Sequence, residues 1–356
     1  MNRPLATALC ALLLTAESGA GARKPRNANP LTPAQEVVRL EGGRRVDFIG
    51  AFSSEADLKG PPSFWRRAFD LIAGPPEYHH LVRPYGIATD SFGRILITDP
   101  GDRSVHIFDF AKRKYSHYDH GKHGEEFCSP MGIAVDGQDN FYVTDSVLGK
   151  IFVFNSKGSF RRFIGASGPN EGFFKRPTGI AIDKQHNEIF VSDTLRDKVF
   201  VMDLAGHILR DFGSRGSGPG EFNFPTEVLL HGDDVLVVDA MNFRVQVFDR
   251  QGHYRSQFGS EGSQSGSIYR PKGLGMDSEG SIYLVDGLFE TVQVFDRAGL
   301  LLYYFGQTGT GNAEFQLPSG LWIDKDDRIY VADSYNHRVQ MLHFVSAQRT
   351  GSGRPE

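Results

Sequence analysis

Residues 318–343 read PSGLWIDKDDRIYVADSYNHRVQMLH, and this stretch contains the pattern that decides the fold. It holds three short runs rich in β-branched and aromatic residues: Gly320–Asp324, Ile329–Asp333 and Val339–His343. Between the runs lie Asp, Asn, Lys and Ser, which favour turns. The stretch is therefore predicted to form three strands joined by two tight turns.

The same pattern occurs six times along the chain. Each copy begins with the phrase Pro-x-Gly-Ile-Ala-x-Asp or a variant of it, and the six prolines are 46 to 48 residues apart: Pro84, Pro130, Pro177, Pro225, Pro271 and Pro318. A fourth run ends in four copies at a phenylalanine: Phe163, Phe212, Phe258 and Phe305. Four strands per repeat make one antiparallel sheet, which cannot bury both faces alone. The sequence therefore predicts an all-β fold, a six-bladed β-propeller.

The ends of the chain indicate how the ring closes. The sixth copy stops after its third strand near Phe344, and residues 346–356 are a polar tail. Residues 65–74 resemble the fourth run at 160–165, so we expect this N-terminal segment to supply the outer strand of the last blade. Val46–Phe52 is predicted as a further strand without an assigned place, which puts the propeller at 65–345 and a separate segment at 23–64.

Residues 1–22 have the pattern of a cleaved export signal. A basic start is followed by an apolar stretch from Leu5 to Ala16 and by small residues ending at Ala22. The apolar stretch is too short for a stable membrane span, so no span is expected in the mature chain. Removal of the signal leaves Cys128 as the one cysteine, so no internal disulfide is possible. We expect export to a bacterial periplasm or cell surface.

Composition excludes two further classes of protein. The 356 residues include 28 Phe and 12 Tyr with a formal net charge of −4, which argues against intrinsic disorder. With 39 Lys and Arg against 43 Asp and Glu, the chain has no general positive field that would attract nucleic acid.

The phrases Pro-x-Gly-Ile-Ala-x-Asp, Ile-Tyr-Val-Ala-Asp-Ser-x-Asn-His-Arg-Val-Gln and Phe-Gly-x-x-Gly resemble NHL repeats, the unit of one class of six-bladed propellers. The resemblance covers about residues 65–344. It implies the fold but not an activity, because this family includes peptide-amidating lyases, RNA-binding propellers and exported bacterial proteins. The lyases use His ligands around the channel, whereas the first strands here contain one His, so the resemblance does not favour lyase activity.

Each second strand ends in an aspartate, and in four copies a cation follows five residues later: Lys150, Lys198, Arg244 and Arg338. Such a ring of charges has two interpretations. The aspartate and the cation of one copy can bridge one tight turn and satisfy loop amides. Alternatively, Arg244 and Arg338 can contribute to a binding surface. Ser104 and Thr291 replace the cation in copies one and five, so those turns are expected to be held differently.

The first strand lies innermost in a propeller, so the residues after each repeat proline are expected near the channel mouth. Tyr85 and Lys272 are the candidate binding residues there. In copy four, Glu227 replaces the usual Gly and His231 the usual Asp, and we take Glu227 as a candidate ligand contact at the mouth. The two residues are about 13 Å apart along an extended strand, so one metal ion cannot bind both.

Histidines are concentrated between residues 79 and 123. His79, His80, His123 and Cys128 fall on adjacent connections and offer nitrogen and sulfur ligands for zinc or copper. The alternative is an outer strand with exposed histidines followed by a polar loop, since strand and loop spacing does not impose convergence.

Two functions follow from these features. The first is an exported, non-enzymatic scaffold that binds a protein, peptide or polysaccharide through its loop face, with Phe243, Phe289 and Tyr335 on that face. The second is a metal-dependent hydrolase or lyase at the channel mouth. The first needs no cofactor, and none is expected.

Overall fold

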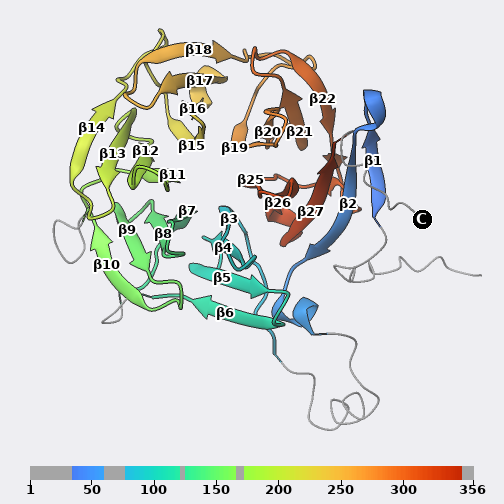
Figure 1. Cartoon of the computed structure of the whole chain (residues 1–356), viewed down its shortest axis with the longest axis horizontal. Helices are drawn as coiled ribbons and strands as arrows, with labels where there is room; N and C mark the ends of the chain where they lie inside the picture. Colours follow the sequence, from blue (N-terminus) through green and yellow to red (C-terminus); the bar gives the residue numbers. More distant parts are fainter. Residues whose placement is uncertain (1–33, 60–76, 121–124, 166–171, 347–356) are drawn as a thin grey trace, which may run out of the picture.

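The computed structural model describes residues 34–59, 77–120, 125–165 and 172–346. Six antiparallel sheets surround a central channel, and the chain passes from one blade to the next around the ring (Figure 1). Blades one to five have four strands each, ordered from the channel outward as they follow in sequence. The prediction of an all-β, six-bladed propeller is confirmed.

The strands agree with the runs predicted from the repeat. In blade one they are β3 (Ile87–Thr89), β4 (Ile95–Asp99), β5 (Ser104–Asp109) and β6 (Lys114–Tyr118). In blade two they are β7 (Pro130–Val135), β8 (Phe141–Asp145), β9 (Lys150–Phe154) and β10 (Phe160–Ile164). In blade three they are β11 (Pro177–Asp183), β12 (Glu188–Asp193), β13 (Lys198–Asp203) and β14 (Ile208–Phe212).

Blades four and five repeat this arrangement. Blade four contains β15 (Pro225–His231), β16 (Asp234–Asp239), β17 (Arg244–Asp249) and β18 (Tyr254–Phe258). Blade five contains β19 (Pro271–Met276), β20 (Ile282–Asp286), β21 (Thr291–Phe295) and β22 (Leu301–Phe305). The short β23 (Gln307–Thr308) and β24 (Glu314–Phe315) pair in parallel in the connection to blade six. Short 3-10 turns are η1 (Glu41–Gly43), η2 (Glu55–Leu58), η4 (Ala240–Asn242) and η5 (Ser334–Asn336).

Blade six joins the two ends of the chain. Its inner strands are β25 (Leu321–Ile323), β26 (Arg328–Asp333) and β27 (Arg338–Val345), and its fourth strand is β2 (Arg45–Phe52). Closure by an N-terminal strand is therefore confirmed, but the strand is β2, which pairs with β27 from Arg45↔Val345 to Phe52↔Val339. The segment 65–74, expected in this place, lies outside the described residues, so the propeller begins before the predicted boundary.

A fifth strand, β1 (Gln35–Arg39), covers the outer edge of blade six beside β2 (Figure 1). The choice of β2 as the closing strand follows from its side chains. Val46, Phe48 and Phe52 are buried, and the Phe52 ring lies 4.7 Å from the Phe108 ring of blade one, centroid to centroid. The N-terminal strand thus joins the last blade to the first.

The core lies between neighbouring blades. Each of six buried clusters combines apolar side chains from two adjacent sheets; one of them packs Val105 and Ile107 of blade one against Phe141 and Phe152 of blade two. Both faces of the inner strands are covered, which explains why they are almost continuously apolar.

The glycine of each Pro-x-Gly phrase is required by close packing around the channel. A Cβ atom at Gly132 would lie 2.3 Å from the carbonyl oxygen of Thr178 in the next blade, and one at Gly320 would lie 2.0 Å from that of Tyr85. The first strands therefore approach each other as only glycine allows. No helix in the described ranges is long and apolar enough to cross a bilayer.

Candidate functional site

The aspartate that ends each second strand holds the loop leading into the first strand of its own blade. Asp99 accepts the backbone N–H groups of Val82 at 2.6 Å and Arg83 at 2.9 Å. Asp193 accepts the N–H of Arg176 at 2.9 Å, and Asp286 accepts that of Arg270 at 3.2 Å. The carboxylate ring is therefore structural, and in copies one, two, three and five it fixes the backbone of the residue before the repeat proline.

Those residues surround a cavity of about 310 Å³ at the channel mouth. Arg83, Arg176 and Arg270 come from blades one, three and five, and Lys272 comes from the first strand of blade five. The remaining lining is largely neutral and includes Tyr85, Met131, Ser319 and Tyr335. Of the candidate residues named for the mouth only Lys272 is a cation, whereas the structure places four cationic side chains there.

None of these four cations forms an ion pair with a carboxylate within the described ranges. Three of them influence one another, since burial and the charges of Arg270 and Arg176 lower the pKa of Lys272 to about 8. Burial and the nearby Glu227 raise the pKa of Tyr85 well above its usual value, so this phenol stays neutral. The mouth is positively charged, and the part of the chain that the structure describes places no carboxylate in its lining.

Glu227 lies deeper in the channel than predicted. It occupies the place of the packed glycine in the other copies and lines a second cavity of about 120 Å³, not the one at the mouth. Burial raises the pKa of Glu227 to about 8, so the carboxyl is mainly protonated at neutral pH. His231 lies at the far end of the strand, where its Nε2 is 3.2 Å from the Arg297 guanidinium. Glu227 is thus a channel residue and not a ligand contact at the mouth.

The predicted aromatic surface is partly assembled. Phe243 and Phe289 are linked by Tyr269, whose ring centroid lies 5.8 Å from that of Phe243 and 6.4 Å from that of Phe289. We call these three residues the aromatic row. Tyr269 is 46% exposed and directly precedes Arg270, which places the row beside the mouth. Tyr335 lines the mouth itself.

Arg244 and Arg338 have structural roles, which corrects their selection as binding residues. The Arg244 side chain is 6% exposed and donates to Asp239 at 2.8 Å. It also donates to backbone carbonyls of the preceding loop, including that of Glu221 at 2.9 Å. Arg338 donates in the same way to Asp333 at 2.7 Å. The interpretation that this pair bridges a turn holds for both arginines, whereas Lys150 and Lys198 contact Glu125 and Asp211 instead.

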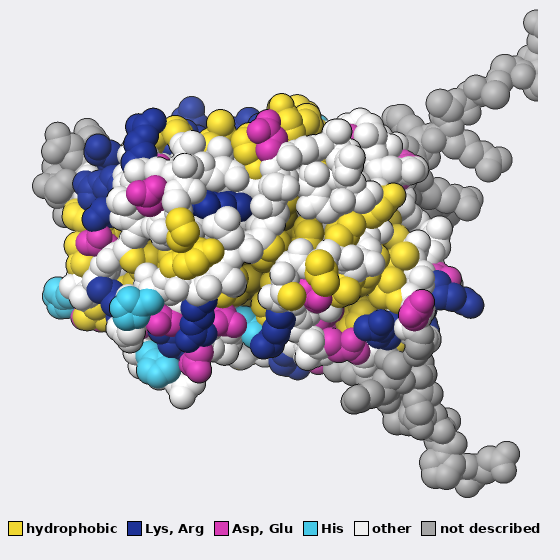
Figure 2. Space-filling model, turned by 90° about the horizontal axis from the view of Figure 1, so that it is seen from above, with side chains coloured by type: hydrophobic (Ala, Val, Ile, Leu, Met, Phe, Trp, Pro, Cys, Tyr) yellow, Lys and Arg dark blue, Asp and Glu magenta, His cyan; other side chains and the backbone are white. Residues whose placement is uncertain are grey.

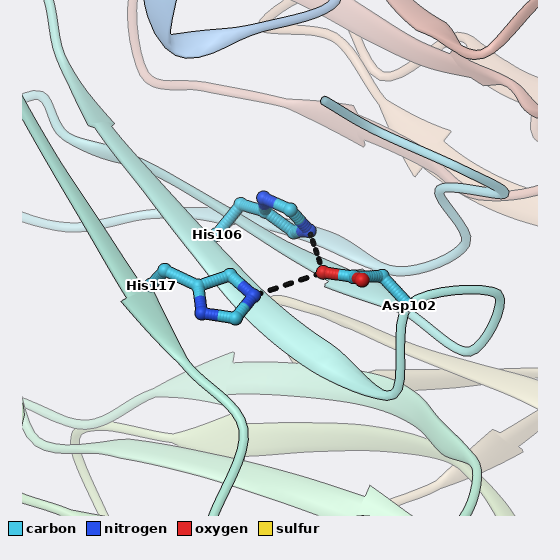
Figure 3. A group of neighbouring side chains, drawn as sticks. All are labelled: Asp102, His106 and His117. Carbon is cyan, nitrogen blue, oxygen red and sulfur yellow. Dashed lines mark hydrogen bonds and ion pairs between the residues drawn. The ribbon is translucent and has the colours of Figure 1, made fainter. Parts of the chain in front are cut away.

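The histidine group is centred on different residues from those predicted. Asp102, His106 and His117 converge at the rim of blade one, and their potential ligand atoms all lie within 4.8 Å of one another (Figure 3). The His79 ring lies 4.6 Å from the His117 ring, but the His79 side chain is 56% exposed and nearest to Glu55.

The other predicted metal ligands do not join this cluster. His80 is exposed, and its backbone forms a bridge with Ser54. His123 lies outside the described residues. Burial raises the pKa of the Cys128 thiol, so it remains protonated, and no group of three or more candidate ligands within the described ranges includes it.

Three other histidines lie in turns between the first and second or the third and fourth strands of their blades, and each contacts one carboxylate. His186, His207 and His253 each contact an aspartate of their own turn. Figure 2 views the ring from its edge and shows histidines gathered along one side among acidic and basic side chains. These are surface turn pairs, with one carboxylate for each imidazole.

Comparison with known families confirms the class of protein. Residues 137–211 match a family model described as a 6-bladed beta-propeller, and residues 315–341 match the NHL repeat. The chain is a six-bladed β-propeller built from NHL-type repeats, as the sequence resemblance implied.

Solved structures with the same fold differ widely in what they do. Virginiamycin B lyase from Staphylococcus aureus is 15% identical, with a TM-score of 0.55, over 74% of this chain and 96% of the lyase chain. A protein of unknown function from Bacteroides thetaiotaomicron is 16% identical, with a TM-score of 0.59, over 74% of this chain and 70% of its own.

An auxiliary nutrient binding protein from the same organism is 12% identical, with a TM-score of 0.58, over 75% of this chain and 70% of its own. At such identities the likeness shows the fold alone. No curated protein matches this sequence.

Sequence reasoning missed the arginines before the repeat prolines, although their signal was present. The residue before the proline is Arg in copies one, three and five and uncharged in the other three. Three of the four cations at the mouth precede a repeat proline, whereas Lys272 follows one.

Proposed function

We propose that this protein is a non-enzymatic binding module whose channel mouth holds an acidic group of a protein or peptide partner. The observation that carries the proposal is the set of four cations without ion-pair partners around one cavity. Holding like charges together is unfavourable, and a bound anion relieves the repulsion among them.

The chemistry of the mouth fits a carboxylate. Guanidinium groups offer paired N–H donors that match the two oxygens of a carboxylate, and such hydrogen bonds are stronger than neutral ones. The cavity of about 310 Å³ is at the small end of ligand sites, which suits one or two acidic side chains better than a large cofactor.

The aromatic row supports a peptide as the partner. Phe243, Tyr269 and Phe289 continue the surface away from the mouth, and Met241 and Leu288 beside them are 53% and 49% exposed. Aromatic side chains are enriched in protein interfaces, where they contribute most of the binding energy. A peptide with acidic residues next to apolar ones complements both features.

The alternative of a metal-dependent hydrolase or lyase at the mouth has less support. Within the described ranges, the cavity lining includes no His, Cys, Asp or Glu that would hold a catalytic metal ion there. Glu227 lines the other cavity and is mainly protonated at neutral pH.

Fluorescence anisotropy with labelled peptides tests this function. Peptides of alternating Glu and Leu are expected to bind, whereas peptides of Gln and Leu are not, and competition by sodium chloride is expected to weaken binding. Unlabelled polygalacturonate serves as a competitor of a different class. Equal binding of the acidic and neutral peptides contradicts the proposal, and tighter binding of polygalacturonate identifies an anionic polysaccharide as the partner instead.

We also propose that residues 1–22 direct export to a bacterial periplasm or cell surface. Expression of the full chain in a Gram-negative host followed by fractionation tests this, with N-terminal sequencing of the product. A periplasmic or surface product that begins at Arg23 supports export, and an uncleaved cytoplasmic product contradicts it.

A further inference from the structure

We propose that Asp102, His106 and His117 form a binding site for a divalent transition metal ion, with zinc as the first choice. The three side chains come from β5, β6 and the turn before β5 (Figure 3), and none of them lines the cationic mouth. It rests on three observations: the equivalent place in other blades holds a cation, the local charge is unbalanced, and the donor atoms converge.

Blade four shows what normally occupies this place. Arg244 lies there between Asp239 and Gln257, with donor–acceptor distances of 2.8 Å to each. The neighbouring Gln246 pairs in register with Gln257 across β17 and β18. In blade six the third strand also begins with an arginine, Arg338, which donates to Asp333 at 2.7 Å.

Blade one keeps the aspartate, as Asp99, but it has neither the arginine nor the two glutamines of blade four. Ser104 stands where blade four has Arg244, which removes the guanidinium. His106 and His117 pair in register across β5 and β6, as Gln246 and Gln257 do. Two imidazoles thus face the volume that an arginine fills elsewhere, and a turn carboxylate, Asp102, joins them.

The carboxylates in blade one lack the arginine partner that the equivalent aspartate has in blades three, four and six. Asp99 and Asp102 form ion pairs with no Lys or Arg within the described ranges. Asp99 accepts backbone N–H groups, and Asp102 lies against the two histidines. The Asp99 side chain is fully buried. A buried carboxylate is stabilised by a nearby positive charge as well as by hydrogen bonds. A divalent cation would restore the charge that Arg244 provides in blade four.

The three donor atoms are spaced as metal ligands require. Oδ2 of Asp102 lies 3.4 Å from Nε2 of His106 and 2.8 Å from Nε2 of His117. Ligands at about 2.0–2.1 Å from a tetrahedral zinc ion are about 3.4 Å apart, so small rotations suffice to admit the ion. Ser104 Oγ donates to the same Oδ2 at 2.8 Å and lies 2.9 Å from His106 Nε2, so its hydroxyl is placed to act as a fourth ligand.

The surroundings of His106 also suit a metal ligand. Its Nδ1 lies 2.6 Å from the hydroxyl of Tyr115, which holds the ring in place. A ligating imidazole usually forms such a hydrogen bond through its other nitrogen, which leaves the Nε2 lone pair for the ion. Asp102 and His117 are 35% and 20% exposed, so an ion can enter from solvent. Imidazole with carboxylate favours zinc and its neighbours over magnesium or calcium.

Isothermal titration of zinc chloride into the untagged, chelator-treated full chain tests the site. We expect one ion per chain, and a loss of affinity of more than about 100-fold in His106→Gln/His117→Gln. The matched control is His207→Gln/His253→Gln, which removes two histidines that each contact a single aspartate on the opposite face. This control is expected to bind zinc as the wild type does.

A second variant distinguishes loss of the metal ligands from loss of the fold. Ser104→Arg/His106→Gln/His117→Gln rebuilds the blade-four arrangement, so we expect it to be folded by circular dichroism and not to bind zinc. Visible absorption of the cobalt complex reports coordination directly. Absence of stoichiometric zinc binding by the wild type, or unchanged zinc binding by either variant that lacks His106 and His117, overturns the proposal.

Discussion

The carboxylate of Asp99 accepts the backbone N–H of Arg83 at 2.9 Å, and this contact ties the repeat pattern to the candidate site. The aspartate ends the second strand, whereas the arginine lies in the loop that leads into the first strand at the channel mouth. Since blades three and five repeat the contact with Arg176 and Arg270, the elements that define the fold also position the cations.

Replacement of Asp193 tests the structural role of this carboxylate. Asp193 is fully buried and accepts the N–H groups of Lys175 and Arg176, so Asp193→Ala leaves two loop amides without a partner. We expect the free energy of unfolding to fall by about 1–3 kcal/mol, measured with urea. Asp211→Ala removes a surface ion pair and is expected to change it by less than about 0.5 kcal/mol. Equal effects of the two variants contradict this role.

Replacement of Phe52 tests how the ring closes. Phe52 is 2% exposed and packs against Phe108 and Phe110, so Phe52→Ala leaves a cavity between the last blade and the first. The expected loss is about 3–5 kcal/mol in urea unfolding. Phe92, which is 58% exposed, provides the control Phe92→Ala, for which little change is expected. A small effect at Phe52 means that β2 does not contribute to closure as described.

The buried carboxyl of Glu227 makes stability depend on pH. Burial raises the pKa of Glu227 to about 8 in the folded state. The contribution of this carboxyl to the free energy of unfolding is therefore present at low pH and is lost as the pH rises toward 8. Glu227→Gln stays neutral, so we expect its stability relative to wild type to rise by about 2–4 kcal/mol from pH 5 to pH 9.

Urea unfolding at each pH measures the Glu227 effect, and Lys272 titrates in both proteins, so its contribution cancels in the difference. Glu261→Gln, at an exposed carboxylate, is the control and is expected to show no such trend. A flat difference between Glu227→Gln and wild type excludes a protonated Glu227.

The aromatic row is expected to contribute to partner binding without holding the fold together. Tyr269 is 46% exposed, so Tyr269→Ala should leave the unfolding free energy nearly unchanged. Its affinity for an acidic, apolar peptide should fall by about 5- to 20-fold in fluorescence anisotropy. Leu300→Ala, at a 67% exposed residue before β22, is the matched apolar control. If both variants bind equally well, the row is not part of the interface.

The repeat alone predicts the blades because each local feature agrees with the global fold. Strand runs, turn aspartates and the Pro-x-Gly phrase recur in phase, and the structure places them as expected. The closing strand was harder to predict, because residues 65–74 share an Arg-Arg pattern with β10. The decisive feature, burial of Val46, Phe48 and Phe52, depends on a partner strand almost 300 residues away.

The sites were less predictable, since they depend on which positions of different blades meet. Ser104 was recognised as an exception in the sequence, but the convergence of His106 and His117 on the emptied volume needs the β5–β6 register. Glu227 was also recognised as an exception, whereas its depth in the channel follows from packing. The arginines before the prolines can be recognised as one group only once the structure shows that they line the same cavity.

The most direct test of the account is the affinity of Arg83→Gln/Arg176→Gln/Arg270→Gln for an acidic peptide, compared with Lys114→Gln/Lys157→Gln/Arg161→Gln. The second variant removes the same charge from exposed side chains outside the mouth. The account predicts a loss of more than about 100-fold for the first and less than about threefold for the second. Equal losses, or full binding by the first variant, would contradict recognition at the channel mouth.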